Sequence, residues 1–411
     1  MAVSALPGLS GLPDADVLRI PQDFPPGPLF TVPPVLAELR DKRPVCPVEM
    51  PSGNRLWLVT RYADVRFVMN DPRFSRDLVF PGAPRMAGDD LTSVEGSLFN
   101  LEGADHTRLR AVLGSYFTRR SADEWRSTAW RHARDLLDRM ERRGPGADLV
   151  GEFSEPLVAR FAADVMGISL DEHAWTQERI REQLDLLGSR QQIAAATAAL
   201  GELAGRLVDR SGGSGPGPSG LVATLARAVR AGTITRQEAV GTTGLLLMNV
   251  TDPLVPPLTV GIMTLLLHSA QLADCGRDPE LWPEAVREVL RYHNNGITNF
   301  PRVVLEDVER HGVRMSRGEG VITSALAAAH DPREFADPGV FDIHRAEKGS
   351  VFFGAGPHFC LGSVLAPIVL ATAYAALFER FGGLRLAVEP HEVKRADDGF
   401  FACPASLPVT W

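Results

Sequence analysis

The chain has 411 residues, of which 45% are hydrophobic and 23% charged, the composition of an ordinary globular protein. Its net charge of −8 argues against a nucleic-acid-binding surface. Its four cysteines are scattered without a C-x-x-C pair, so the sequence indicates neither a zinc site nor a disulfide framework.

The N-terminal segment Met1–Pro34 is predicted to be an extended arm, because prolines interrupt it repeatedly. It has no charged-then-apolar targeting pattern, and no run of about 18 apolar residues occurs in it. We therefore expect a soluble, cytoplasmic protein. A reducing compartment agrees with the unpaired cysteines.

Residue periodicity predicts mostly helices in the first half of the chain. Arg55–Thr60, which is β-branched and aromatic, is a predicted strand. Prolines and glycines predict a loop over Leu78–Asn100, and residues 211–220 have the composition of a flexible surface loop. The predicted helices are Val35–Asp41, Arg61–Asn70, Glu124–Gly144, Glu155–Met166 and a pair within His173–Arg210 that breaks near Gly188.

His106 and Arg110 lie at the start of a further amphipathic helix. Because they are four residues apart, they share one helix face. Taken alone, such a basic face is either solvated or paired with two carboxylates.

The longest apolar run with helical spacing is Gly241–Leu267, which we expect to cross the centre of the molecule. Its middle carries Pro253, Pro256 and Pro257. Each interior proline removes a helix hydrogen bond and costs about 3 kcal/mol, so the helix should kink or unwind there. A defect this costly in a buried helix favours a functional site.

The helix predicted over Trp282–Tyr292 contains Glu288 and Arg291, which face the same way and can pair. The same E-x-x-R spacing occurs at Glu284 and Arg287, so the motif is weak by itself. An amide-rich turn follows, and then a β-hairpin region between residues 306 and 319.

The segment Phe353–Gly362 reads F-G-A-G-P-H-F-C-L-G and places Cys360 between a glycine-rich loop and a helix expected from about Leu361. A helix N-terminus stabilises a thiolate, and the glycines allow backbone N–H groups to turn toward the sulfur. A thiolate held in this way is a good axial ligand for haem iron. The alternative is that Cys360 is a small buried hydrophobe.

This segment matches the signature F-G-x-G-x-H-x-C-x-G, and from about Arg55 onward the chain resembles soluble bacterial members of the cytochrome P-450 superfamily. The resemblance implies a mainly α fold, in one domain over residues 1–411, with a smaller β-rich region. Haem b would lie between the distal helix Gly241–Leu267 and the proximal helix after Cys360.

The resemblance also assigns roles. Cys360 would ligate the haem iron, Gly362 would belong to the same loop, and Phe353 would shield the sulfur. Glu288 and Arg291 would lock the haem-binding core. The implied propionate-binding residues are His106, Arg110, Arg302 and His358.

In the family, the middle of the distal helix reads A-G-x-[DE]-T, in which the acid and the hydroxyl supply protons for dioxygen activation. Here Asp252 keeps the acid, but Pro253 replaces the threonine, and Thr251 stands one residue early. We expect Asp252 and Thr251 to be the catalytic proton donors, with ordered water or the substrate itself as the alternative sources. The expected substrate-pocket residues are Leu246, Asn249, Val250, Pro253, Asn295, Thr298, Phe400 and Phe401, of which the two phenylalanines suit core packing equally well.

The implied function is a haem-thiolate oxidoreductase acting on a small molecule of specialised, antibiotic-type metabolism. A ferredoxin and its reductase would supply electrons to a monomer that binds neither nucleic acid nor membrane. Without the threonine, the open alternatives are monooxygenation, cyclisation, desaturation, coupling, a peroxide-driven reaction, and a non-redox isomerase or dehydratase-like reaction. Family peroxygenases carry an arginine where Asn249 stands, so only half of their pattern is present. Pro367 replaces the arginine of the family's L-A-R, which weakens the case for an acidic ferredoxin.

Overall fold

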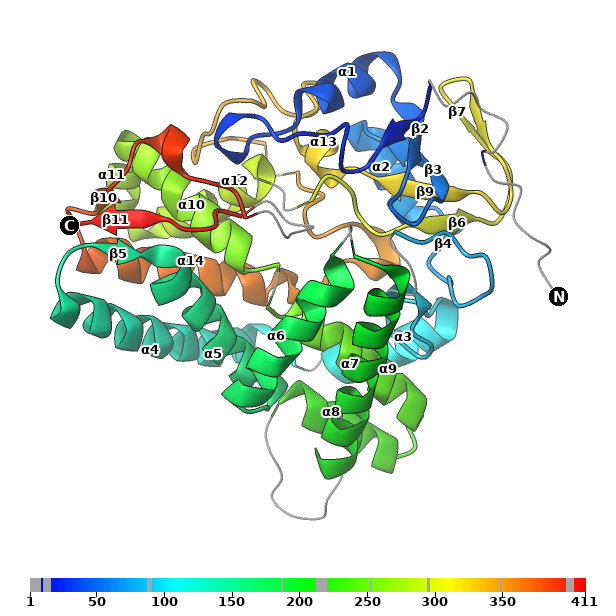
Figure 1. Cartoon of the computed structure of the whole chain (residues 1–411), viewed down its shortest axis with the longest axis horizontal. Coiled ribbons are helices and arrows are strands. Elements are labelled where there is room, and N and C mark those ends of the chain that lie inside the picture. Colours follow the sequence, from blue (N-terminus) through cyan, green and yellow to red (C-terminus); the bar gives the residue numbers. More distant parts are fainter. Residues whose placement is uncertain are drawn as a thin grey trace.

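The structure, a computed structural model, describes residues 9, 16–86, 91–114, 116–185, 188–211, 220–251, 253–293, 296–347, 349–396 and 403–411. Helices make up most of the molecule, and the strands of the largest sheet gather at one corner of it (Figure 1). The predicted mainly helical fold with a smaller β-rich region is therefore confirmed. Most of the predicted flexible loop, residues 212–219, lies outside the described residues.

The α-helices are α1 (Pro34–Lys42), α2 (Tyr62–Asn70), α3 (Gly103–Gly114), α4 (Arg119–Arg143), α5 (Glu155–Met166), α6 (Leu170–Leu184), α7 (Arg190–Ser211), α8 (Leu221–Arg230), α9 (Arg236–Asn249), α10 (Val255–Leu267), α11 (Ser269–Arg277), α12 (Trp282–Tyr292), α13 (Ala325–Ala329) and α14 (Leu365–Arg380). The predicted helices are present, most with shifted ends, and the structure adds α8, α11 and α13, which were not predicted. The helices α4, α6 and α9 begin several residues earlier than expected. Thr118 caps the first, and Ser169 with Glu172 and Thr235 with Glu238 form capping boxes at the other two.

The largest sheet has the strand order β1-β2-β3-β9-β6-β4. In it, β4 runs antiparallel to β6 with Ser75 opposite Val303, which brings the residue after β4 close to Arg302. The N-terminal arm is not simply extended, because β1 pairs with β2. The strands of this sheet are β1 (Leu18–Arg19), β2 (Val45–Glu49), β3 (Arg55–Val59), β4 (Phe74–Ser75), β6 (Arg302–Val304) and β9 (Gly320–Thr323); the others are β5 (Ala147–Asp148), β7 (Val308–Arg310), β8 (Val313–Met315), β10 (Arg385–Leu386) and β11 (Pro408–Thr410).

The main core surrounds α10, α12 and α14. α14 packs against α4 and α12, and α10 contacts both α12 and α14. By length and hydropathy, the stretch Leu361–Arg380 and the bent pair α10–α11 could each cross a membrane. Both segments pack against neighbouring helices, as interior helices of a globular fold do.

The long apolar helix predicted over Gly241–Leu267 is broken, as its prolines required. α9 ends at Asn249 and α10 begins at Val255, and Pro256 and Pro257 occupy the first turn of α10. There the missing proline N–H groups cost little, because the first N–H groups of a helix have no partner within the helix. The break therefore lies in the middle of the element that crosses the molecule.

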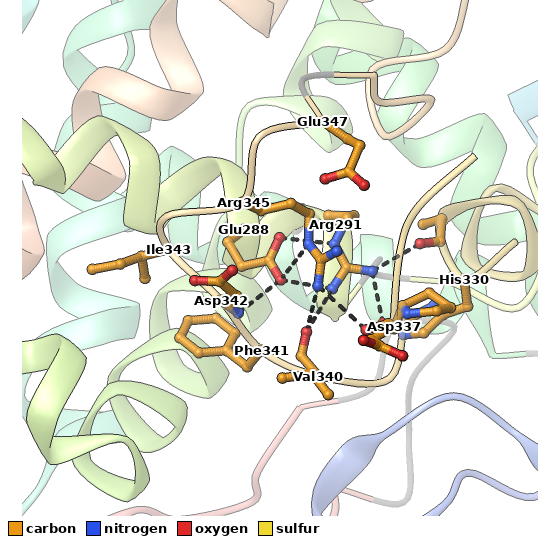
Figure 2. Close-up of polar contacts among 12 residues, drawn as sticks. Glu288, Arg291, His330, Asp337, Val340, Phe341, Asp342, Ile343, Arg345 and Glu347 are labelled. Carbon is orange, nitrogen blue, oxygen red and sulfur yellow. Dashed lines mark hydrogen bonds and ion pairs between the residues drawn. The ribbon is translucent and has the colours of Figure 1, made fainter. Parts of the chain in front are cut away.

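Glu288 and Arg291 form a buried ion pair on α12, each with 3% of its side chain exposed (Figure 2). Arg291 donates through Nε and Nη2 to the carboxylate at 2.8 and 2.6 Å, and Arg345 Nε donates to the same Oε1 atom as Arg291 Nη2, at 3.3 Å. Arg291 also donates to the carbonyls of Ala329 and Pro338 at 2.9 Å. The network therefore joins α12 to the loop that precedes the Cys360 segment.

Candidate active site

The loop before Cys360 is held in a tight, defined conformation. Gly354 and Gly356 have positive φ values of 77° and 72°, and a Cβ on Gly356 would lie 2.6 Å from the carbonyl oxygen of Met69 on α2. Glycine is required at Gly356 on both counts. The backbone N–H of Cys360 donates to the carbonyl of Phe353 at 2.9 Å, which closes the loop.

The sulfur of Cys360 points into the molecule next to a short helix. The turn Leu361–Ser363 is a 3-10 helix and α14 starts only at Leu365, so the α-helix begins later than predicted. The backbone N–H groups of Gly362 and Ser363 and the guanidinium of Arg110 lie near the sulfur, and each favours its anionic form. A Cβ on Gly362 would lie in van der Waals contact with the sulfur, 3.6 Å away, so the glycine leaves that side of the sulfur uncovered.

Burial raises the pKa of the Cys360 thiol, although the two N–H donors and Arg110 oppose that change. The same side chain is open to solvent-sized molecules. Both observations hold together if the sulfur faces a hollow inside the molecule. A desolvated thiolate in that position needs a cation beside it, and soft sulfur ligands suit iron in haem.

Basic side chains gather at one side of this hollow around a single carboxylate. The rings of His106 on α3 and His358 lie 4.4 Å apart, and His358 Nε2 lies 3.2 Å from Glu102. Arg302 on β6 is buried and donates to the carbonyl of Phe74 at 2.9 Å. Arg110 donates to the carbonyl of Phe359 at 2.5 Å.

The charges of this cluster follow from burial. Burial, with the nearby charges of His358 and Arg110, lowers the pKa of His106 to about 4, and burial likewise lowers the pKa of His358. Burial alone would raise the pKa of Glu102, but hydrogen bonds from His358 and from the backbone of Arg76 lower it to about 2. At neutral pH the histidines are therefore neutral donors, whereas the arginines and Glu102 are charged.

The comparisons with known proteins agree with this geometry. The sequence model of the cytochrome P-450 family matches residues 276–401. Nocardicin C N-oxygenase from Nocardia uniformis subsp. tsuyamanensis is 34% identical over 92% of this chain and 95% of its own. Biflaviolin synthase from Streptomyces coelicolor is 34% identical over 94% of each chain.

The chain is a member of the cytochrome P-450 family. Among solved structures, a P-450 with biaryl coupling reactivity has a TM-score of 0.89 at 30% identity and covers 96% of this chain and 100% of its own. The mycinamicin VIII methyl hydroxylase of Micromonospora griseorubida has a TM-score of 0.87 at 29% identity over the same shares. This P-450 is an oxidoreductase that depends on haem iron. Its site fits that group, because a desolvated sulfur donor stands near a cluster of cations and neutral histidines that suits two propionates.

Arg76 and Glu102 of this P-450 lie in the basic cluster but were not predicted from the sequence as site residues. Arg76 follows β4 directly, and the pairing of Ser75 with Val303 brings it next to Arg302. Glu102 precedes α3 and accepts hydrogen bonds from the backbone N–H of Arg76 at 2.6 Å and from the hydroxyl of Ser75 at 3.3 Å. A sequence signal for Arg76 would have required the strand register, which no local pattern gives.

The residues expected around the distal break lie in different environments. Leu246 is buried in a core with residues of α3 and α14, whereas Val250 is half-buried beside the same core. Asn249 is exposed, and its amide donates to the carbonyl one turn earlier at 2.8 Å. Pro253 is half-buried. Asp252, the other expected proton donor, lies outside the described residues, as do Asn295, Phe400 and Phe401.

Thr251 is buried, and its Oγ1 atom lies 2.9 Å from His173 Nε2 on α6. Burial lowers the pKa of His173 to about 4, so the ring is neutral at neutral pH. The hydroxyl of Thr251 is therefore directed to α6 by a partner that the sequence did not indicate. Among the described residues, His173 therefore places a second protic side chain beside Thr251 at the break.

An apolar wall borders the basic cluster. The rings of Phe99 and Phe300 meet edge to face at 4.9 Å, and Phe99 packs with Leu200 and Met248 from α7 and α9. Thr298, an expected pocket residue, is buried, and its hydroxyl has no hydrogen-bond partner among the described residues. A cavity of about 420 Å³ lies between α6, α7, α9 and the loop around residues 94–97. Leu200 lines this cavity and also packs against Phe99 of the wall.

Proposed function

We propose that this P-450 oxidises a small molecule of specialised metabolism with haem b, using the Cys360 thiolate as the axial ligand of the iron. One arrangement carries the proposal: the Cys360 sulfur lies beside the backbone N–H groups of Gly362 and Ser363 and near Arg110, and its side chain is open to a hollow with a basic side. These donors stabilise the anionic form of the sulfur and fix its direction. A buried structural cysteine would need neither feature.

The basic residues would hold the two propionates of the haem. His106 and His358 are neutral, so each has one ring N–H. His106 would donate it to a propionate, His358 would do so in place of its present hydrogen bond to Glu102, and Arg110 and Arg302 would supply the positive charges. Phe353 is half-buried between Phe352 and Phe359, with ring centroids 4.9 and 6.5 Å away, and would cover the sulfur side. This packing would keep water from the sulfur.

When bound, haem supplies the iron that activates dioxygen with two electrons. A hydroxylation would consume the substrate, dioxygen, two electrons and two protons and would yield the hydroxylated product and water. The protein must deliver both protons without the usual helix hydroxyl, because Pro253 has none. We assign their delivery to Asp252, and to Thr251 with His173 Nε2 as its hydrogen-bond partner.

The substrate would lie between the break in the distal helix and the wall formed by Phe99 and Phe300. The unpartnered hydroxyl of Thr298 would donate to a polar group of the substrate, since a buried hydroxyl without a partner is costly. Relatives named for nocardicin C, biflaviolin and mycinamicin support an antibiotic-type substrate. We further propose electron supply by a ferredoxin and its reductase, and a cytoplasmic monomer.

The test replaces the ligand and compares a matched cysteine. Cys360→Ser should abolish the carbon-monoxide difference maximum that is typical of thiolate-ligated haem, whereas Cys403→Ser, on the half-buried C-terminal cysteine, should keep it. Circular dichroism of both variants would show that the fold is retained. A thiolate-type maximum in Cys360→Ser would contradict the proposal.

A further inference from the structure

Arg76 occupies the boundary between the basic cluster and the apolar wall. Its guanidinium carbon lies 4.1 Å from the ring centroid of Phe99, within the distance of a cation–π contact. On its other side stand Arg302, whose charge repels it, and Glu102, whose charge attracts it. Arg76 therefore faces two kinds of surroundings: charged groups, and the aromatic ring of the wall.

The guanidinium of Arg76 lacks the partners that a structural arginine has here. Its Nε is buried without a hydrogen-bond partner, and only its backbone N–H donates a hydrogen bond among the described residues. Arg291 and Arg345, by contrast, each donate to the Glu288 carboxylate and to backbone carbonyls. A buried guanidinium without an anion is unfavourable, and arginine does not lose its proton in proteins.

The local charges are also unbalanced. Arg76 and Arg302 stand near one carboxylate, Glu102. The oxygens of Glu102 accept hydrogen bonds from His358, Ser75 and the backbone of Arg76, and among the described residues neither guanidinium bonds to them. Burial lowers the pKa of Arg76 well below its usual value, although the side chain as a whole is only half-buried. One further anion would balance the pair of arginines.

We propose that Arg76 binds a carboxylate that enters the hollow beside Phe99. A carboxylate offers two oxygens to the planar guanidinium, which is the pairing with the best geometry for arginine. The carboxylate has two possible sources, a haem propionate or an acid group of the substrate whose apolar part would lie on the wall. The proposal rests on the haem-thiolate site described above, and adds to it a ligand contact that the four propionate-binding residues do not make.

The experiment compares Arg76→Gln and Arg76→Lys with Arg73→Gln. Arg73 is a matched control because it lies three residues earlier, is about one-third exposed, and pairs with Asp71 at the surface at 2.6 Å. In the first arm, each protein is reconstituted with haem or with haem dimethyl ester, and haem transfer to excess apomyoglobin is timed. If a propionate binds Arg76, haem loss from Arg76→Gln should be at least tenfold faster than from Arg73→Gln, and the esterified haem should remove that difference.

In the second arm, the ferric proteins are titrated with 4-phenylbutyrate and with its neutral amide, and binding is followed by the shift of the haem band. If a substrate acid binds Arg76, the preference for the carboxylate over the amide should fall at least tenfold in Arg76→Gln, with haem loss unchanged. Arg76→Lys should be intermediate in whichever arm responds, because lysine keeps the charge but not the two-pronged geometry.

Either response supports the proposal and identifies the source of the carboxylate. If Arg76→Gln keeps its circular dichroism spectrum but purifies without haem while Arg73→Gln retains it, the propionate is the partner. Arg76→Gln behaving like Arg73→Gln in both arms would overturn the proposal. That result differs from failure of the haem-thiolate assignment, in which the unmodified protein itself would lack the thiolate-type carbon-monoxide maximum.

Discussion

The Nε2 atom of His173 lies 2.9 Å from the Oγ1 atom of Thr251 and joins α6 to the break between α9 and α10. Both side chains are buried. The prolines prevent one continuous helix across this region, so contacts from neighbouring elements must fix its conformation. The bond to α6 is one such contact, and it connects the helix that covers the distal side to the segment that carries the expected proton donors.

A double-mutant cycle should detect this bond. Thr251→Val removes the hydroxyl at nearly constant volume and should cost about 1 kcal/mol of unfolding free energy, as should loss of the ring nitrogen in His173→Leu. The double variant should cost less than the sum by about 0.5 kcal/mol or more. Thr259→Val is the control, because Thr259 bonds to a carbonyl of its own helix, and it should be additive with His173→Leu. Additive costs for Thr251 and His173 in urea unfolding would contradict the prediction.

Stability should also depend on pH through His173. Burial lowers its pKa to about 4, from 6.5, so the unfolded chain takes up the proton first as the pH falls. The stability associated with neutral His173 is complete above pH 6.5 and is lost progressively down to about pH 4. His173→Gln should reduce the slope of unfolding free energy against pH in that window by up to about 1.4 kcal/mol per pH unit. His391→Gln, at an exposed site, should leave the slope unchanged; equal slopes in both variants would refute the assignment.

Proton delivery can be tested at the two expected donors. Asp252→Asn and Thr251→Ala should each divert electrons from product to peroxide, because dioxygen activation needs two protons. We expect several-fold more peroxide per NAD(P)H consumed, measured with the substrate that gives the largest haem-band shift. Thr259→Ala on α10 is the control and should keep the parent ratio. Unchanged turnover and peroxide release in both variants would remove these residues from the relay.

The sequence could predict features that depend on local rules. Pro256 and Pro257 fit only the first turn of a helix, so the break in the distal helix followed from their positions. The starts of α6 and α9 are also encoded locally, since Ser169 with Glu172 and Thr235 with Glu238 are recognisable capping boxes. Most of the fold therefore follows from spacing, caps and the family resemblance.

The site contacts that were missed depend on tertiary structure. Arg76 comes near Arg302 only through the register of β4 with β6. Glu102 accepts hydrogen bonds from Arg76 and His358, which lie 26 and 256 positions away in the sequence. His173 meets Thr251 across 78 residues. No local pattern identifies such partners, because each is an ordinary polar residue in its own segment.

The buried pair of Glu288 and Arg291 should matter far more than its overlapping copy. Glu288→Gln leaves Arg291 and Arg345 without their buried carboxylate, and breaking a buried pair costs about 3–5 kcal/mol. Glu284→Gln removes a pair with about one-third of its side chains exposed and should cost under about 1 kcal/mol. Urea unfolding of the haem-loaded proteins measures both. Similar costs for the two variants would show that the buried network does not lock the haem-binding core.

Electron supply can be tested at Pro367, which stands in the first turn of α14, seven residues after Cys360. Pro367→Arg restores the cation that the family uses at this position. If the donor is an acidic ferredoxin, the variant should be reduced several-fold faster at low salt, and this gain should shrink at high salt because salt screens the added charge. The rate is read from formation of the carbon-monoxide complex after mixing with reduced ferredoxin.

Leu170→Arg adds the same charge at an exposed site on α6 and should change the rate little. A gain of equal size in both variants, or none in Pro367→Arg at any salt concentration, would show that an acidic partner does not meet this face.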